Sequence, residues 1–290
     1  SGWNNPLRWI LNILIGLLEI IYVPRYPKWL ILEVGVDHPG DMQRTASWLK
    51  PTVGVITAFG RVPSHVEFFD SPEEVMREKA QLLNYVREGG AVILNADDEN
   101  VLKIKNKIDR KVYLYGKENP EADIVASHAS IIYDEQDNPT GVSFKVNTTG
   151  NVVPVNLKGV IGDQYSYPIL VALSVGLAIN LSWVDIVKTL DEFKAPPGRM
   201  NLHLGENNSI LIDDTYNASP VAMEKAIDVL SETQTKGKRI AVLGDMAEIG
   251  RFSASEHRKV GSLIREKKID ILITIGLASK LINEQAIEEG

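Results

Sequence analysis

The sequence predicts an α/β fold, with a central doubly wound, mostly parallel sheet that carries a small antiparallel sheet, followed by a second α/β domain. Three observations predict this. Short apolar runs, typical of parallel strands buried on both faces, alternate with segments of helical period. Between residues 112 and 158 strictly alternating segments interrupt that rhythm, and it restarts after Ala195-Pro196-Pro197-Gly198. We therefore expect two domains, residues 1–196 and 197–290.

The composition restricts the class of protein. Of 290 residues, 44% are hydrophobic and 24% charged, as in globular domains, and the net charge of −7 argues against nucleic acid or an anionic membrane surface as the main partner. There is no cysteine, which excludes disulfides, thiol catalysis and cysteine-based zinc sites. A reducing compartment suits such a chain, so we expect a cytoplasmic location.

The first elements are predicted from apolar runs. Residues 9–23 are apolar but too short and interrupted for a membrane span, so we expect no membrane insertion and a buried helix packed on the sheet. Residues 29–33 read as a parallel strand and residues 53–57 as the next. A short helix over 41–49 lies between them.

The next helix begins at Ser71, because Ser71, Pro72 and Glu74 have the pattern of a capping box with proline at the first helical position. It is predicted to run to Val86. Lys79 falls on its apolar stripe, where burial is costly unless the amine has a partner or loses its charge. The alternatives are a snorkelling lysine or one paired with a neighbouring acid.

A third strand over 91–94 ends at Asn95, and Glu33 and His65 follow or lie near the ends of the other strands. Ligands of doubly wound sheets bind beyond the carboxyl ends of the strands. These polar residues are therefore expected near one ligand-binding edge, with Lys79 one helix away.

The rest of the chain completes the prediction. Helices are expected over 162–180 and 184–193, after the two antiparallel hairpins. Beyond the boundary, strands over 209–212, 239–243 and 271–275 and a helix from Ser219 form a Rossmann-like domain that we expect to be incomplete.

Seven stretches, in order along the chain, resemble the Mur ligase superfamily. Two of them, Asp213-Asp214-Thr215-Tyr216-Asn217-Ala218 and Gly244-Asp245-Met246-Ala247-Glu248, resemble the branch that adds D-alanyl-D-alanine to a UDP-linked muropeptide. The seven are residues 32–40, 53–57, 65–71, 94–98, 197–200, 212–220 and 242–250.

The resemblance implies an ATP-dependent ligase of peptidoglycan precursor synthesis. In this family ATP phosphorylates a carboxylate, and an amine such as that of D-alanyl-D-alanine attacks the acyl phosphate. It further implies that Glu33, His65 and a carbamylated Lys79 hold Mg²⁺. The alternatives are an ion-paired or helix-capping acid at Glu33 and a loop histidine satisfied by its neighbours at His65.

The same resemblance implies a nucleotide site. Arg199 would be catalytic, with Lys79, by contacting the ATP phosphates, which a guanidinium fork suits. Asp214 would bind the ribose, and the remaining nucleotide contacts would come from Asn95, Tyr216 and Asn217. The alternatives are a linker arginine at Arg199 and a helix-capping acid at Asp214. Asp245 to Glu248 and His257 also resemble family positions, with no role assigned, and the alternative for them is a solvated helix start.

Two departures from the family pattern bear on activity. The phosphate-binding loop, G-x-x-G-K-T/S, does not occur in the sequence. The adenine-side motif, Gly-x-His-Asn-x-x-Asn, is replaced by a run with Gln164, Tyr165 and Pro168 at its polar positions. We therefore expect a fragment that is inactive alone. The alternatives are a non-catalytic binding module or a superfamily ligase acting on folate or a peptide-like substrate; the oligomeric state is not predicted.

Overall fold

The computed structural model describes residues 5–22, 27–148, 150–190 and 192–288. The chain divides into two units, residues 1–35 and 36–290, and each is described by itself. Among the described residues no helix is both long and apolar enough to cross a membrane.

The N-terminal unit holds one helix, α1 (Pro6–Tyr22). The side chain of Asn5 caps it by accepting from the backbone N–H groups of Leu7 and Arg8, at 3.1 and 3.3 Å. The predicted strand over 29–33 is wrong, since these residues form no regular structure. A strand needs a neighbouring strand for its hydrogen bonds, and this unit contains none among its described residues. The predicted packing of the helix on the sheet concerns the placement of this unit and remains a prediction.

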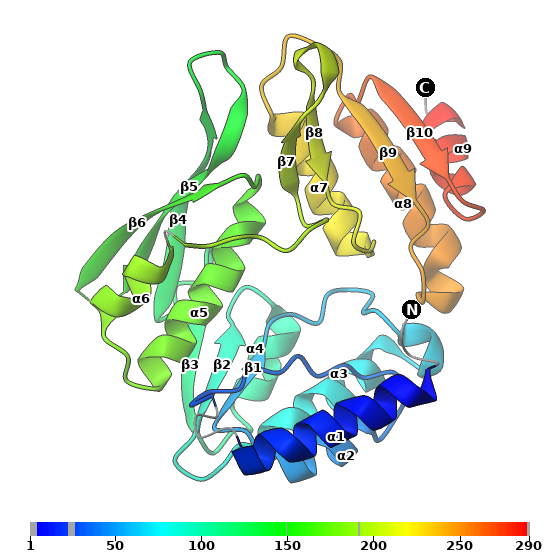
Figure 1. Ribbon diagram of the computed structural model, residues 1–290. Coiled ribbons are helices and arrows are strands. Elements are labelled where there is room, and N and C mark those ends of the chain that lie inside the picture. The colour runs from blue at the N-terminus through cyan, green and yellow to red at the C-terminus, as the bar shows by residue number, and fades with distance from the viewer. Residues whose placement is uncertain (1–4, 23–26, 149, 191, 289–290) are drawn as a thin grey trace. The chain divides into compact units, whose positions relative to one another are not determined.

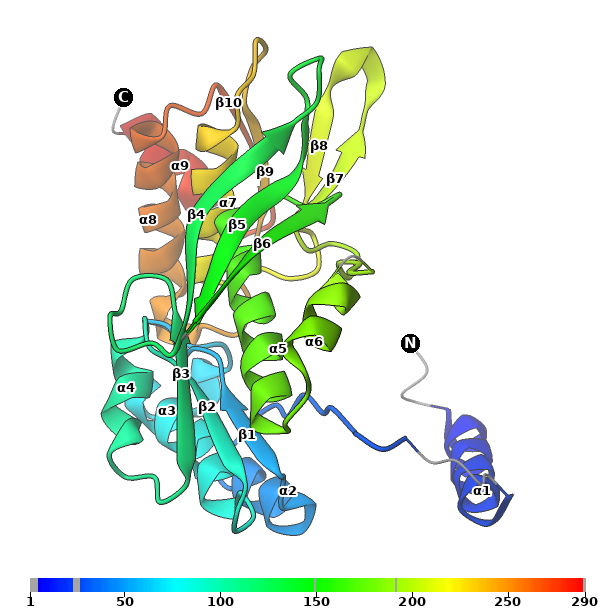
Figure 2. The same cartoon turned by 90° about the vertical axis from the view of Figure 1, so that its left-hand side faces the viewer.

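The larger unit is built on a six-stranded sheet in sequential order (Figure 1). Its first four strands, β1 to β4, run parallel, and β4 to β6 pair antiparallel. The predicted fold class is confirmed, and the antiparallel strands are attached to the parallel sheet as predicted, because they continue it (Figure 2). The strands are β1 (Val53–Ile56), β2 (Ala91–Asn95), β3 (Lys111–Gly116), β4 (Ile124–Tyr133), β5 (Pro139–Thr148) and β6 (Asn151–Lys158).

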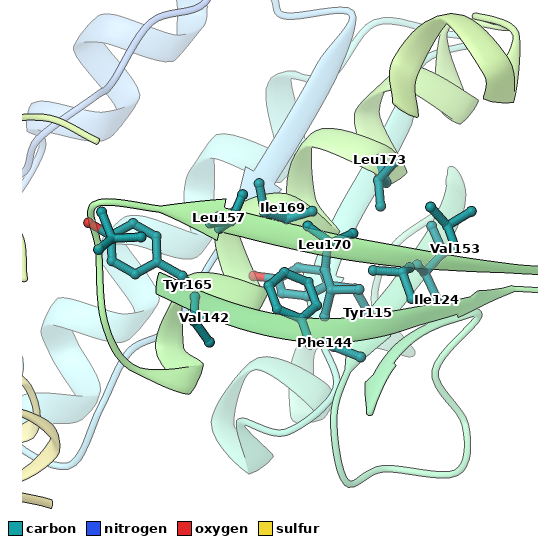
Figure 3. Close-up of a cluster of buried hydrophobic side chains, with 14 of the residues drawn as sticks. Tyr115, Ile124, Val142, Phe144, Val153, Leu157, Tyr165, Ile169, Leu170 and Leu173 are labelled. Carbon is teal, nitrogen blue, oxygen red and sulfur yellow. The ribbon is translucent and has the colours of Figure 1, made fainter. Parts of the chain in front are cut away.

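Helices cover this sheet, and the longest, α5 (Ser166–Ala178), lies over the core cluster. Its Ile169, Leu170 and Leu173 are buried with Phe144 and Leu157 from the strands (Figure 3). Burying such apolar side chains is the main favourable term in folding. The other helices of this part are α2 (Asp41–Leu49), α3 (Pro72–Ala80), α4 (Glu99–Lys105) and α6 (Trp183–Leu190), with 3-10 turns η2 (Val66–Phe68), η3 (Gln81–Tyr85) and η4 (Asp163–Tyr165).

The helix that carries Lys79 begins as predicted. The hydroxyl of Ser71 accepts from the N–H of Glu74 at 3.3 Å, but the Glu74 carboxylate accepts from the N–H of Asp70, not Ser71. The α-helix ends at Ala80, and a 3-10 turn continues it to Tyr85. The predicted span to Val86 therefore holds as helical chain but not as a single α-helix.

The C-terminal part contains two small sheets. The parallel pair β9 (Ile240–Gly244) and β10 (Ile271–Ile275) was predicted, and it packs against α7 (Pro220–Glu232), α8 (Ser253–Glu266) and α9 (Lys280–Glu288). The other sheet is a hairpin of β7 (Asn201–Leu204) and β8 (Ile210–Asp213). We missed β7, because its four residues carry only two apolar side chains. The remaining 3-10 turns are η5 (Glu206–Asn208) and η6 (Gly250–Phe252).

Candidate functional site

Lys79 is more than half buried near the end of α3. Burial lowers the pKa of its amine, and no described carboxylate forms an ion pair with it. The adjacent Glu78 is itself buried and accepts from the Met42 N–H at 2.9 Å and from the Gln81 side chain at 2.8 Å. The ion-paired alternative is therefore not what the structure has. A lysine with a lowered pKa has a larger share of the neutral amine, which is the form that reacts with carbon dioxide.

His65 lies at the start of η2 with its backbone in the left-handed region, at φ 66°. Its Nδ1 atom is 2.7 Å from Oε2 of Glu248 and 3.5 Å from Oδ1 of Asp37. Its Nε2 atom makes no hydrogen bond to a described residue. A histidine held through one ring nitrogen keeps the other as a possible metal ligand.

Two of the three predicted metal ligands belong to the same structural unit. His65 and Lys79 belong to the larger unit, whereas Glu33 belongs to the N-terminal unit. Within the described residues no group of three His, Asp or Glu side chains has a metal-binding arrangement. The donors of His65 and of a carbamylated Lys79 suit a divalent cation in kind, a nitrogen from one and oxygens from the other.

The predicted nucleotide residues of the C-terminal part do come together. Arg199 donates from Nη1 to Oδ1 of Asn217 at 3.0 Å, and its guanidinium carbon lies 4.2 Å from the centre of the Tyr216 ring. Asp214 accepts from the Met200 N–H at 3.2 Å, and burial raises the pKa of its carboxyl group. A guanidinium, a carboxylate and an aromatic ring thus form one cluster, which we call the Arg199 cluster.

Gly198 allows this cluster to form. Its φ is +69°, and it accepts a backbone hydrogen bond from the Tyr216 N–H at 3.1 Å. A Cβ atom at this position would stand 2.9 Å from the Tyr216 nitrogen. Only glycine combines that conformation with so close an approach at little cost.

Asn95 lies at the carboxyl end of β2 and is buried. Its side-chain oxygen accepts from the N–H of Asp97 at 3.0 Å, so it supports the turn that follows the strand. Asp97 in turn accepts from the backbone N–H groups of residues 117–119 and from the Tyr167 hydroxyl at 3.0 Å. These contacts are structural. A nucleotide role for Asn95 remains a prediction.

The residues of the altered adenine-side motif contact one another and their surroundings. Asp163 pairs with the ammonium of Lys117, which lies 4.9 Å from the centre of the Tyr167 ring. The hydroxyl of Tyr165 donates to the carbonyl oxygen of Arg199, and burial raises the pKa of Tyr165 to about 12. The side-chain oxygen of Gln164 is buried and has no hydrogen-bond partner among the described residues.

His257 has a structural role. It is fully buried in α8, its Nε2 accepts from the Met246 N–H at 3.0 Å, and its Nδ1 lies 2.7 Å from the carbonyl oxygen of Ser253. Because a backbone N–H can only donate, the ring proton lies on Nδ1. The carboxylate of Asp245 likewise accepts from the N–H groups of Leu277 and Ser279, which lowers its pKa.

The sequence reasoning missed the contacts that reach the His65 segment, residues 61–70, from the C-terminal part. Arg61 contacts Glu224 and Glu256, which are 163 and 195 residues away in sequence. Glu248 was singled out without a role. No local pattern carries information on pairs so far apart.

Comparisons with known proteins identify the family to which the chain is similar. The family profile described as "Mur ligase middle domain" matches residues 12–176, and that described as "Mur ligase, glutamate ligase domain" matches residues 198–290. The relatives that this chain matches include enzymes named UDP-N-acetylmuramoyl-tripeptide--D-alanyl-D-alanine ligase. The Bacillus subtilis enzyme is 26% identical over 94% of this chain and 57% of its own length, and the Escherichia coli enzyme is 29% identical over 90% and 55%.

Solved structures give the same result for the fold. MurF from Acinetobacter baumannii superposes with a TM-score of 0.77 at 25% identity, over 88% of this chain and 53% of that one. MurF ligase from Thermotoga maritima, solved in complex with ADP, gives 0.72 at 23% identity, over 93% and 69%. The chain spans about half the length of the curated relatives it matches.

Proposed function

The chain belongs to the Mur ligase family, and on that premise we propose that it contributes to ATP-dependent amide-bond formation in peptidoglycan precursor synthesis. The acid substrate we propose is a UDP-linked muramoyl tripeptide, and the amine is D-alanyl-D-alanine. Relatives named as ligases of these two substrates support the choice over a folate or other peptide-like substrate. We also keep the division into domains 1–196 and 197–290 as a proposal.

The Arg199 cluster is the observation that carries the proposal. Arg199 uses Nη1 on Asn217, so the other donors of its guanidinium can reach phosphate oxygens. A fork of positive charge stabilises a transferring phosphoryl group, which is the first step of acyl-phosphate chemistry. Asp214 would accept from ribose hydroxyls, and Tyr216 supplies an exposed ring beside them.

The metal part of the proposal rests on residue chemistry. We propose that Glu33, His65 and carbamylated Lys79 hold Mg²⁺, which would neutralise charge on the phosphates. The lowered pKa of Lys79 supports its modification, because carbamylation consumes the neutral amine. Carbamylation would turn a buried cation, which is costly, into an anion that a metal ion can pair with.

We further propose that these 290 residues do not turn over substrate alone. The sequence lacks a G-x-x-G-K-T/S loop, which in phosphate-binding folds supplies backbone N–H groups and a lysine to the nucleotide. A second candidate function is a non-catalytic binding module. Two observations favour it, and both fall in the run that replaces the family's adenine-side motif. The carboxylate of Asp163 is already paired with Lys117, and the side-chain oxygen of Gln164 has no hydrogen-bond partner among the described residues.

A calorimetric titration with MgATP tests the proposal. Arg199→Ala and Asp214→Ala are compared with the parent chain and with Arg258→Ala, a matched variant that removes an arginine 3.9 Å from Glu284. We expect weak binding that the first two substitutions abolish and the third leaves unchanged. Binding that survives both substitutions would remove the Arg199 cluster from the nucleotide site. No binding by the parent chain at millimolar MgATP would favour the binding module.

A further inference from the structure

The His65 segment, residues 61–70, packs as a part of the C-terminal core although it precedes that part by more than a hundred residues. Val62 and Val66 are buried in the same apolar cluster as Met246 and Ile249. Gly250 lies so close that a Cβ atom there would stand 2.8 Å from Cβ of Glu67. The segment is therefore held to the C-terminal part by close packing.

Arg61 adds an ionic anchor at the start of the segment. Its Nη2 atom lies 2.8 Å from Oε2 of Glu256 and 3.0 Å from Oε1 of Glu224. Glu256 is only 2% exposed, and its other oxygen, Oε1, forms an ion pair with the ammonium of Lys259 at 2.6 Å. Burial alone would raise the pKa of Glu256, but the hydrogen bonds from Lys259 and Arg61 hold it below its usual value. The anchor is thus a charged carboxylate with both oxygens in use.

Glu248 makes the shorter of two carboxylate contacts to the imidazole of His65; the other is that of Asp37, whose Oδ1 lies 3.5 Å from Nδ1. Oε2 of Glu248 lies 2.7 Å from Nδ1 of His65. Both residues are held in the left-handed backbone region, with φ of 60° at Glu248 and 66° at His65. For residues other than glycine that conformation is unfavourable, because Cβ comes too close to the following carbonyl oxygen. Such strain persists only where the surroundings hold it, and here it lies at both ends of one contact.

We propose that Glu248 is a positioning residue for His65. Its carboxylate accepts a hydrogen bond from the Nδ1–H of the imidazole, which leaves the lone pair on Nε2, and Arg61 holds the His65 segment close to Glu248. An ionised carboxylate can only accept, so the contact requires a proton on Nδ1. In neutral imidazole the other nitrogen is then the acceptor. Glu248 would thereby select both the tautomer and the orientation of the ring.

The value of this arrangement rests on the proposed function. Histidines that bind metal ions almost always donate their other ring N–H to a carboxylate or carbonyl, and losing that partner typically costs 10–100-fold in metal affinity. The family's two matched segments would then meet at one ligand, since His65 lies within residues 12–176 and Glu248 within 198–290.

Nitrogen-15 NMR of the imidazole side chains tests the proposal on the whole chain, at a pH where the histidines are neutral. We expect the His65 proton on Nδ1 in the parent chain. In Glu248→Ala we expect loss of that tautomer, whereas Glu248→Gln, whose amide oxygen still accepts, should retain it. Arg61→Ala should weaken the preference, and Arg258→Ala, the matched arginine control, should not. An unchanged His65 tautomer in Glu248→Ala would overturn the proposal.

A second readout separates this proposal from the metal role. Mn²⁺ added to the parent chain should broaden the His65 resonances selectively, and Glu248→Ala should need about tenfold more Mn²⁺ for the same effect. If the parent shows no selective broadening while the tautomer depends on Glu248, the positioning stands and the proposed metal function of His65 fails. Secondary structure measured by circular dichroism on each variant identifies any that fails to fold, and Glu248→Gln then carries the comparison.

Discussion

Replacing His257 by alanine should strongly destabilise the C-terminal part. The imidazole is fully buried, and it satisfies the backbone N–H of Met246 at 3.0 Å. Truncation leaves that buried donor without a partner, which costs about 1–3 kcal/mol. It also leaves a cavity the size of the ring, and emptied core sites of this kind typically cost about 2–3 kcal/mol more. The expected total is about 3–6 kcal/mol, a large part of the roughly 5–15 kcal/mol by which domains are stable.

Urea unfolding and amide hydrogen exchange measure this effect. His257→Gln should lose only about 1 kcal/mol, because the amide oxygen can accept from the Met246 N–H. His203→Ala is the control, since that ring is 55% exposed and its nearest acid, Asp213, is 3.8 Å away; it should change stability by less than about 0.5 kcal/mol. The Met246 amide should exchange faster in His257→Ala but not in His257→Gln. Equal unfolding free energies for the two alanine variants would refute the structural role of His257.

Three further predictions concern the proposed site. Lys79→Met should be more stable than the parent at neutral pH in carbonate-free buffer. Burial lowers the pKa of Lys79, so the charged amine destabilises the parent fully below the folded pKa and not at all above the unfolded value of 10.5. Thermal melts across pH would contradict this if the difference in melting temperature did not close as pH rises. Asp214→Asn should likewise raise the melting temperature at neutral pH. Because the pKa of Asp214 is raised in the folded chain, the parent loses stability as pH rises through that folded pKa. The difference in melting temperature between variant and parent should vanish below the unfolded pKa of 3.8. Gly198→Ala should lower the free energy of unfolding in urea by about 1 kcal/mol or more beyond the loss in Gly89→Ala. Both glycines have positive φ, but only Gly198 lies against Tyr216. Equal losses would argue against that close approach.

Much of the fold was predictable because its signals are local. The helix over 41–49, the capped start at Ser71 and the fully buried strand β2 follow from caps and apolar runs that a few neighbouring residues define. The prediction failed for residues 29–33, an apolar run with no strand to pair with in the described part of its unit, residues 5–22 and 27–35. It also missed β7, which exists because β8 pairs with it.

The candidate site divides in the same way. The types of residue at Arg199, Asp214, Tyr216 and Asn217 were predictable from motif order. The structure shows that Arg199 contacts Asn217 and Tyr216, and that Asp214 accepts from the N–H of Met200, the residue after Arg199. Whether the predicted residues act in catalysis stays a prediction. The ion-pair alternative for Lys79 could be judged only in three dimensions, because neighbouring Glu78 turns its carboxylate to Met42 instead.

The class of fold, the family and the available side-chain chemistry could be read from the sequence, because caps, apolar periods and motifs are properties of neighbouring residues. Which of those side chains contact one another depends on how distant segments pack. His257 is buried and accepts a hydrogen bond from the Met246 N–H, and the His65 segment contacts Glu248 and Glu256. Such pairs form because folding packs apolar side chains from distant segments into one core, and polar contacts are then made between whatever groups that packing brings within reach.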